Sequence, residues 1–309
     1  MDPERQNERN LSMVVMNERT ETISIAVLIA CYNRKQKTLD FFDSLANQRF
    51  FEGMPVDIYL LDDGSTDGTS QAIKEKYPYT NIITGTGNLF WAGSMRKIWQ
   101  YAIAQKPYKL FCLFNDDVFL CDNAFENLIN HYQQCGRIGT ILIGSTLDPK
   151  DNKISYGGYK LNNSKHSRTL LVEPDKNQSI PCHLGNANIL LIDSTTVQKI
   201  GIFSESYTHG LADYDYTLTA YRSGINVLIA PGYYGYCEND HGFNWLSGSR
   251  PLKERINYLY SPKGLAYKEY LLYIKKHFPL DFLPGFTKLW LKTLFPFFWE
   301  KFKRRDILD

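Results

Sequence analysis

The chain has 309 residues, of which 43% are hydrophobic and 22% charged, a balance typical of a folded globular protein of one or two domains. Its formal net charge is only +2, so no strong positive field predicts nucleic acid as a partner. Six cysteines occur without a C-x-x-C pair, which favours reduced thiols in a cytosolic protein over a disulfide framework or a zinc site.

Residues 1–22 form a polar, charged stretch, which we interpret as a tail without a secretion signal. No apolar run in the chain reaches the length of a membrane span. From residue 23 on, short apolar runs alternate with helical patterns. Strands are predicted at 24–30, at 56–61, at 81–84 and in the run that ends at Asn115. This alternation predicts an α/β fold with a mostly parallel central sheet and helices on both faces.

Polar clusters follow three of the predicted strands. They are Tyr32, Asn33 and Arg34 after the first strand, Asp62 and Asp63 after the second, and Asn115, Asp116 and Asp117 at the end of the fourth. Because the carboxyl ends of parallel strands meet at one edge of a sheet, we expect these clusters to converge there. The adjacent carboxylates of the last cluster lie beside an apolar strand, so they require a cation or hydrogen-bond donors as partners.

Common nucleotide and calcium motifs do not fit this edge. The first strand–helix turn reads ACYNRK, without the glycines of a dinucleotide fingerprint, and a P-loop is absent too. The segment DDGSTDGT matches the start of an EF-hand loop, but Lys74 stands where a bidentate glutamate is required. What remains is a nucleotide held by side chains, with a divalent cation on its diphosphate.

Six segments carry a family resemblance. In chain order they are VLIACYNRKQKTLDFFDSL, LLDDGSTDGT, GNLFWAGSMRKIWQYA, FNDDVFL, the stretch from GNANILL to LTAYRSG, and ENDHG. Together they resemble the family-2 nucleotide-sugar glycosyltransferases, which are inverting enzymes of the GT-A fold. The sequence is most similar to the bacterial rhamnosyl- and galactofuranosyltransferase branch. The resemblance covers about residues 24–245, and it implies a GT-A domain over 23–245 followed by a C-terminal segment over 246–309.

The resemblance implies a donor site at the sheet edge. Its members are Tyr32, Asn33, Arg34, Asp62, Asp63, Asn88, Trp91, Arg96 and Asp116. Asp63, together with Asp62, is expected to hydrogen-bond the base or ribose, and Trp91 and Arg96 to lie beside the diphosphate. The residues alone leave simpler readings open: Asp-Gly-Ser-Thr is also a common turn and helix cap, and GNLFWAGSMRK also suits a loop that enters a helix.

The segment NDD resembles the D-x-D metal motif of the family, with Asn115 in place of the first carboxylate. The resemblance implies that Asp117 binds the metal and that His241 of ENDHG is the second ligand. Nitrogen beside carboxylate oxygens suits Mn²⁺ or Mg²⁺. The alternatives are a solvated aspartate pair and a structural histidine.

The segment LADYDYTLTAYRSG carries the candidate catalytic base. The resemblance implies this role for Asp213, with Ala212 in the first acidic place of the family pattern, and it assigns acceptor orientation to Asp215. Gly185 and Asn186 resemble the acceptor-side loop of the family. The alternative for Asp213 is a helix-terminal charge that complements the helix dipole.

The C-terminal segment mixes aromatic and leucine residues with lysine and arginine in FLPGFTKLWLKTLFPFFWEKFKRR. This pattern predicts an amphipathic element that lies on an anionic membrane surface. The alternative is a helix that packs back on the catalytic domain. The resemblance implies acceptors that are lipid-linked, as is common in this bacterial branch.

These observations lead to one functional hypothesis. It is an inverting, metal-dependent transfer of a hexosyl or deoxyhexosyl group from a dTDP- or UDP-sugar to a hydroxyl of a lipid-linked bacterial surface glycan, such as O-antigen. The protein is then expected in the cytoplasm, peripheral on the inner face of the membrane, with homo-oligomerisation left open. The alternatives are a nucleotidyltransferase of similar fold and a catalytically inactive glycan- or nucleotide-binding module.

Overall fold

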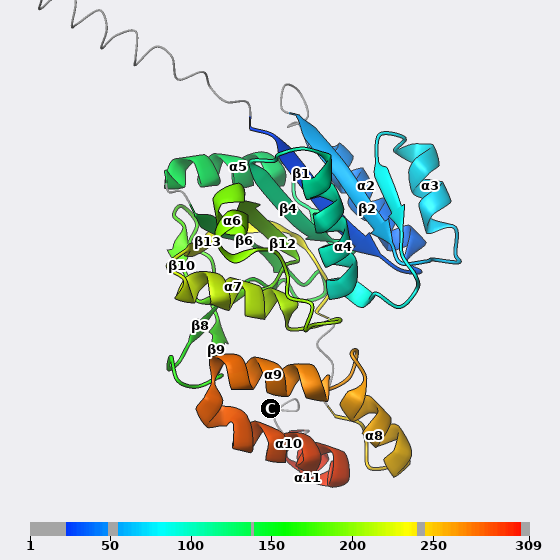
Figure 1. Ribbon diagram of the computed structural model, residues 1–309, viewed down its shortest axis with the longest axis vertical. Coiled ribbons are helices and arrows are strands. Elements are labelled where there is room, and N and C mark those ends of the chain that lie inside the picture. Colours follow the sequence, from blue (N-terminus) through cyan, green and yellow to red (C-terminus); the bar gives the residue numbers. More distant parts are fainter. Residues whose placement is uncertain (1–22, 49–54, 137–138, 240–244, 304–309) are drawn as a thin grey trace, which may run out of the picture.

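The computed structural model describes residues 23–48, 55–136, 139–239 and 245–303 (Figure 1). Its first half contains the predicted strands. They are β1 (Ile25–Cys31), β2 (Val56–Asp62), β3 (Asn81–Thr84) and β4 (Leu110–Asn115). These strands are all parallel, in the order β4-β1-β2-β3. The connecting helices are α2 (Lys35–Ala46), α3 (Thr69–Lys76) and α4 (Phe90–Gln105). The predicted α/β alternation is therefore confirmed.

The second half of the sheet is mixed. Its strands are β6 (Thr140–Leu147), β10 (Ile180–Pro181), β12 (Ile189–Asp193) and β13 (Asn226–Tyr236), with the short strands β5 (Phe119–Leu120) and β7 (Ile154–Tyr156) at its margin. Strand β12 runs antiparallel between β4 and β6, whereas β13 is parallel to β6. A separate small sheet contains β8 (Gly158–Leu161), β9 (Thr169–Leu171) and β11 (Leu184–Gly185). Strand β12 starts beside the carboxyl end of β4 and runs back along it, with Ile189 opposite Phe114 and Asp193 opposite Leu110.

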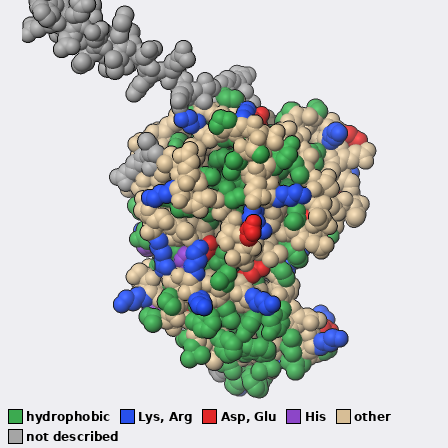
Figure 2. All heavy atoms as spheres, viewed as in Figure 1, with side chains coloured by type: hydrophobic (Ala, Val, Ile, Leu, Met, Phe, Trp, Pro, Cys, Tyr) green, Lys and Arg blue, Asp and Glu red, His purple; other side chains and the backbone are tan. Residues whose placement is uncertain are grey.

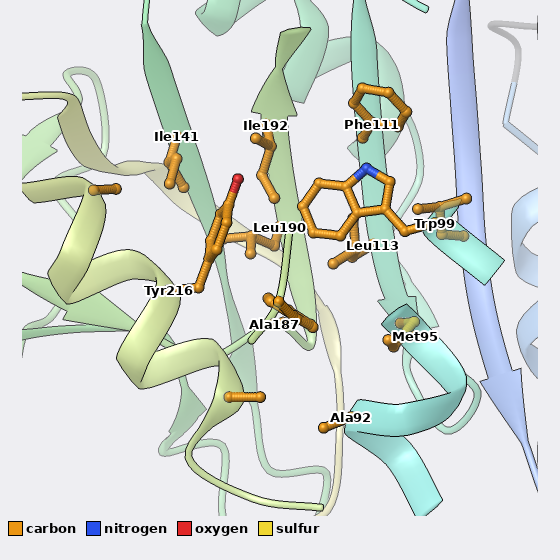
Figure 3. Close-up of a cluster of buried hydrophobic side chains, with 14 of the residues drawn as sticks. Ala92, Met95, Trp99, Phe111, Leu113, Ile141, Ala187, Leu190, Ile192 and Tyr216 are labelled. Carbon is orange, nitrogen blue, oxygen red and sulfur yellow. The ribbon is translucent and has the colours of Figure 1, made fainter. Parts of the chain in front are cut away.

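Helices cover both faces of the large sheet because its strands are apolar on both sides. In β1, Ala26 and Leu28 face the cluster that contains α4 and α7 (Ala212–Arg222), while Val27 and Ile29 face α2, α3 and α5 (Ala124–Cys135). Figure 3 shows Trp99 of α4 and Tyr216 of α7 side by side on one face of the sheet; their ring centroids are 5.5 Å apart. Burial of such large side chains positions the N-termini of α4 and α7 near each other.

The C-terminal segment forms a helical layer below the sheet domain, drawn in orange and red in Figure 1. Its elements are α8 (Leu252–Tyr260), α9 (Tyr267–His277), the 3₁₀ turn η2 (Pro279–Asp281), α10 (Phe282–Leu294) and α11 (Phe297–Lys303). Tyr273, Ile274 and Phe278 join the core cluster of α4 and α7, so α9 packs against the catalytic domain. Among the described residues, no helix is both long enough and apolar enough to cross a membrane.

Candidate active site

The three polar clusters converge at one edge of the sheet. The register pairs Cys31 of β1 with Asp62 of β2, and Ala30 of β1 with Asn115 of β4. These strands therefore end side by side, and the residues that follow them share one surface. The sequence predicts this convergence from the polar residues that follow the strands.

A pocket opens at this edge between the sheet, α4 and the C-terminal segment. Its side-chain lining includes Tyr32, Arg34, Asp63, Phe90, Trp91, Asp116, His209 and Lys263. Five of these residues were predicted from the sequence as donor-binding. The sequence does not predict the other three, which are Phe90, His209 and Lys263. They come from the start of α4, the loop before α7 and the turn after α8, and no local sequence pattern indicates that these segments meet.

Arg34 is the cationic partner of the adjacent aspartates after β4. Its Nη1 atom lies 2.7 Å from Oδ2 of Asp117 and 3.4 Å from Oδ1 of Asp116. Asp116 is buried and also accepts a hydrogen bond from Thr38 Oγ1 at 3.2 Å. Burial, followed by the negative charge of Asp117, raises the pKa of Asp116 to about 7. The pair is therefore an electronegative site that favours a cation.

The residues present at the predicted metal site fit a cation only in part. Asp117 is held by Arg34, whose guanidinium stands in for a cation, and its other oxygen accepts from Sγ of Cys237 at 3.7 Å. Asn115 is engaged elsewhere, since its Oδ1 accepts from Nε1 of Trp91 at 2.8 Å. His241 lies outside the described residues, so its ligand role stays a prediction. Within the described ranges no three acidic, histidine or cysteine side chains gather as a metal site.

Asp63 shapes the pocket by holding the loop before α4. Its two carboxylate oxygens accept four backbone hydrogen bonds of 2.8 to 3.1 Å, from the N–H groups of Thr86, Gly87, Leu89 and Phe90. A Cβ at Gly85 would lie 2.4 Å from Oδ1 of Asp63, which explains the glycine there. Asp62 instead stays inside the turn, where it accepts from Ser65 N at 2.8 Å and from the hydroxyl of Ser70. Asp62 therefore fits the turn alternative, while α3 begins at Thr69 without a side-chain cap.

Besides Asp62, three predicted donor residues do not line the pocket. Asn33 joins two loops, since its Oδ1 accepts from the backbone N–H of Thr66 at 2.8 Å. Asn88 is exposed. Arg96 donates from Nη1 to the main-chain oxygens of Ser204 and Tyr207, at 2.9 and 3.2 Å. Its guanidinium therefore anchors the loop that leads to His209 and α7.

Asp213 lies in the first turn of α7, directly after Leu211 and Ala212. One carboxylate oxygen accepts from the N–H of Tyr214 at 2.9 Å and the other from the N–H of Ala187 at 3.2 Å. Burial raises the pKa of Asp213 to about 6 in spite of these bonds and of the adjacent Asn186 amide. A carboxylate with such a pKa is well matched to general-base chemistry near neutral pH.

A short series of hydrogen bonds joins the pocket to Asp213. Trp91 in the pocket wall donates to Asn115, and the backbone N–H of Asn115 donates to the carbonyl of Asn188 at 3.1 Å. The neighbouring Ala187 N–H contacts Asp213. The candidate base is therefore connected to the pocket wall through the backbone of residues 187–188, although it is not among the lining residues.

Two of the three predicted acceptor-side residues, Gly185 and Asp215, have structural partners. Gly185 is buried, and a Cβ there would lie 2.4 Å from Cδ1 of Ile143, so close packing accounts for it. Asp215 turns toward α9, where its carboxylate contacts Lys276 Nζ and His277 Nε2, each at 2.8 Å. Burial would raise the pKa of Asp215, but the hydrogen bonds from His277 and Lys276 outweigh it and keep that pKa below its ordinary value.

This sheet order, with an acidic pair at its carboxyl edge, is the arrangement expected of the GT-A fold. The protein belongs to glycosyl transferase family 2, because the model of that family matches residues 26–183, more than half of the chain. The family and fold expected from the sequence are therefore confirmed.

Individual relatives are distant. The 4,4'-diaponeurosporenoate glycosyltransferase of Staphylococcus aureus (strain bovine RF122 / ET3-1) is 24% identical over 120 residues, which are 39% of this chain and 31% of that protein. The chain thus matches about a third of this curated relative's length.

Two solved structures support the fold. S. aureus TarS has a TM-score of 0.52 at 13% identity, over 70% of this chain and 37% of TarS. The mannosyltransferase PcManGT from Pyrobaculum calidifontis, solved with GDP-Man and Mn²⁺, also has a TM-score of 0.52 at 13% identity, over 89% of this chain and 72% of PcManGT.

Proposed function

We propose that the protein transfers a sugar from a nucleoside-diphosphate sugar, dTDP- or UDP-linked, to an acceptor hydroxyl with inversion. The observation that carries this proposal is the pocket at the sheet edge, which combines aromatic walls with the Arg34–Asp117 pair and is linked to Asp213 through Asn115 and the backbone of residues 187–188. Membership of glycosyl transferase family 2 supports the reaction class. The GDP-Man and Mn²⁺ bound to PcManGT support a nucleotide-sugar donor and a metal.

The reaction requires a proton acceptor on the side of the hydroxyl. The acceptor oxygen attacks the anomeric carbon, the bond from that carbon to the diphosphate oxygen breaks with its electron pair, and the hydroxyl proton passes to Asp213. One displacement of this kind inverts the anomeric centre. Tyr32 and Trp91 supply flat apolar surfaces to hold the base or the sugar.

A divalent cation, Mn²⁺ or Mg²⁺, is part of the proposal. Asp117 and His241 would hold it, and when bound it would neutralise negative charge on the diphosphate. Arg34 Nη1, 2.7 Å from Oδ2 of Asp117, holds this side chain at the edge of the site.

The acceptor side of the proposal is a lipid-linked bacterial surface glycan, reached from the inner face of the cytoplasmic membrane. It is supported by an apolar patch, which we define as Leu280, Leu283, Phe286, Leu294, Phe297 and Phe298, all exposed on η2, α10 and α11. Figure 2 shows this apolar surface at the bottom of the molecule, with lysine and arginine side chains along its upper margin. Apolar side chains bordered by positive charge suit an anionic membrane surface.

The proposed function is tested by a panel of nucleotide sugars. Each is added with Mn²⁺, with Mg²⁺ or with EDTA, and thermal stabilisation and release of nucleoside diphosphate are measured. We expect one donor to raise the melting temperature only with metal, and to be hydrolysed slowly without acceptor. Stabilisation without any turnover would favour the inactive binding module. Release of inorganic diphosphate from a nucleoside triphosphate would favour the nucleotidyltransferase.

A further inference from the structure

The C-terminal segment contributes a positively charged side chain to the donor pocket. Lys263 lies in the turn between α8 and α9, far along the chain from the family-matched region. Its Nζ atom is 6.0 Å from the ring centroid of Tyr32 and 6.0 Å from that of Phe90, on the pocket wall. At this distance, the outer limit of a cation–π contact, the ammonium group is attracted to the two rings.

The turn that carries Lys263 has a defined backbone. The N–H of Gly264 donates to Ser261 at 2.9 Å, and the N–H of Leu265 donates to Tyr258 at 3.0 Å. A Cβ at Gly264 would lie 2.0 Å from the Tyr258 carbonyl oxygen, so only glycine fits there without a backbone shift. The position of Lys263 is therefore set by the fold of the C-terminal segment.

Arg34 and Asp63, two other charged residues of the pocket, already have partners within the described residues. The guanidinium of Arg34 is paired with Asp116 and Asp117, and the carboxylate of Asp63 is saturated by backbone N–H groups. Lys263 has no carboxylate within ion-pair distance among the described residues. Its charge is consequently available to an anionic ligand.

His209 adds a polar group without a partner on the same wall. Among the described residues its buried Nδ1 atom makes no hydrogen bond, and its ring centroid lies 6.1 Å from that of Phe90. The loop that carries it is fixed to α4, because Gly93 N–H donates to the carbonyl of Thr208 at 3.3 Å. Burial, and then the charges of Lys263 and Arg34, lower the pKa of His209, so the histidine is neutral and the positive charge on this wall is that of Lys263.

We propose that Lys263 binds the diphosphate of the donor, and that the C-terminal segment thereby completes the donor pocket. The inference rests on the proposed function, since it assigns a residue to the same nucleoside-diphosphate ligand. Negative charge grows on the diphosphate as the glycosidic bond to it breaks, and an ammonium group already fixed at the pocket stabilises that charge. Lys263 then acts both on donor affinity and on the departure of the leaving group.

Three ligands that share one nucleobase distinguish diphosphate binding by Lys263 from a general packing role in the pocket. The full-length chain is titrated by calorimetry with the nucleoside diphosphate of the donor that gives the strongest thermal stabilisation, then with the corresponding monophosphate and nucleoside. We expect Lys263→Ala to weaken diphosphate binding about ten- to hundredfold, the range for a charge-assisted hydrogen bond. Nucleoside binding should change less than about twofold, because the base contacts remain.

Matched variants complete the experiment. Lys263→Met keeps the apolar stem over the rings and should lose the same affinity, while Lys263→Arg keeps the charge and should retain most of it. Lys268→Ala removes an exposed lysine of α9 and should bind like the unaltered protein.

The outcomes separate the inference from the proposed function. If the unaltered protein binds no nucleoside diphosphate, the proposed function fails. If it binds and Lys263→Ala and Lys263→Met bind equally well, the inference fails alone. Equal losses for diphosphate and nucleoside would also overturn it, since Lys263 would then act only by packing on Tyr32 and Phe90.

Discussion

Lys276 of α9 contacts both carboxylate oxygens of Asp215 of α7, each at 2.8 Å, and so ties the C-terminal segment to the helix that carries the candidate base. The neighbouring His277 adds a hydrogen bond to the same carboxylate, and Tyr207 donates another at 2.9 Å. Asp215 is buried, so these donors replace the water that its charge has lost. The segment that brings Lys263 to the pocket is thus attached two residues from Asp213.

Asp215→Asn should mainly affect stability. It leaves buried donors without a charged acceptor, and we expect it to lower the free energy of unfolding by about 2–3 kcal/mol. Its kcat should fall less than that of Asp213→Asn. Lys268→Ala is the control, because it removes an exposed lysine of the same helix and should change the free energy of unfolding by less than about 0.5 kcal/mol. Denaturant unfolding measures both; an unchanged midpoint for Asp215→Asn would show that this junction does not hold the segment.

The sequence predicts the parallel half of the sheet well, since an apolar run such as 81–84 is bounded by turns on both sides. It does not predict the antiparallel β12, because strand direction depends on pairing with distant partners. Asp62 and Asp63 are adjacent and chemically identical, yet only Asp63 faces the pocket, since successive side chains leave a strand on opposite sides. The sequence around Arg96 predicts a diphosphate contact, but the guanidinium binds the main-chain oxygens of Ser204 and Tyr207, which are distant in the chain.

Asp213→Asn tests the candidate base. The amide keeps the size of the side chain and most hydrogen bonds but cannot take the acceptor proton. We expect kcat to fall by about two to four orders of magnitude, with donor affinity nearly unchanged. Steady-state kinetics with calorimetric donor titration checks both quantities. Near-normal turnover, or a defect confined to donor binding, would remove Asp213 from the base role.

The pH profile of kcat gives a second check on Asp213. Burial raises the pKa of this carboxyl from 3.8 to about 6, and only the deprotonated form accepts a proton. In the unaltered protein kcat should therefore be level above about pH 7 and decline tenfold per pH unit well below pH 6. The decline should be absent from the residual activity of Asp213→Asn. If kcat declined only near pH 4 instead, the base would be a solvent-exposed carboxylate with an ordinary pKa.

Asp117→Ala tests the metal. Asp117 is the predicted ligand, so its loss should abolish the Mn²⁺-dependent part of donor binding. The fold should survive, because the carboxylates of Asp117 and Asp116 repel each other and the substitution removes that repulsion. Thermal unfolding and donor titration with Mn²⁺ or EDTA measure the two effects. Full activity of the unaltered protein in EDTA would contradict metal dependence directly.

Membrane docking is tested by substitutions within the apolar patch. A deletion of α10 would disturb packing, because Leu289 and Thr293 of this helix are buried and Arg255 donates to the Thr293 carbonyl at 2.7 Å. Leu283 and Phe297 are 69% and 52% exposed, so Leu283→Asp with Phe297→Asp should leave the fold intact. We expect the double variant to lose at least about tenfold in sedimentation with phosphatidylglycerol vesicles, since each side chain contributes about 1.5–3 kcal/mol when buried in lipid.

The control for this docking test is Leu170→Asp, which adds the same charge at a residue of β9 that is 59% exposed and lies outside the apolar patch. It should bind vesicles like the unaltered protein. Binding should weaken with added salt and be poor on phosphatidylcholine alone, because the lysine and arginine margin acts through anionic headgroups. If the unaltered protein ignores the vesicles and instead forms a dimer that the double variant disrupts, the apolar patch is covered by a second copy of the chain rather than by lipid.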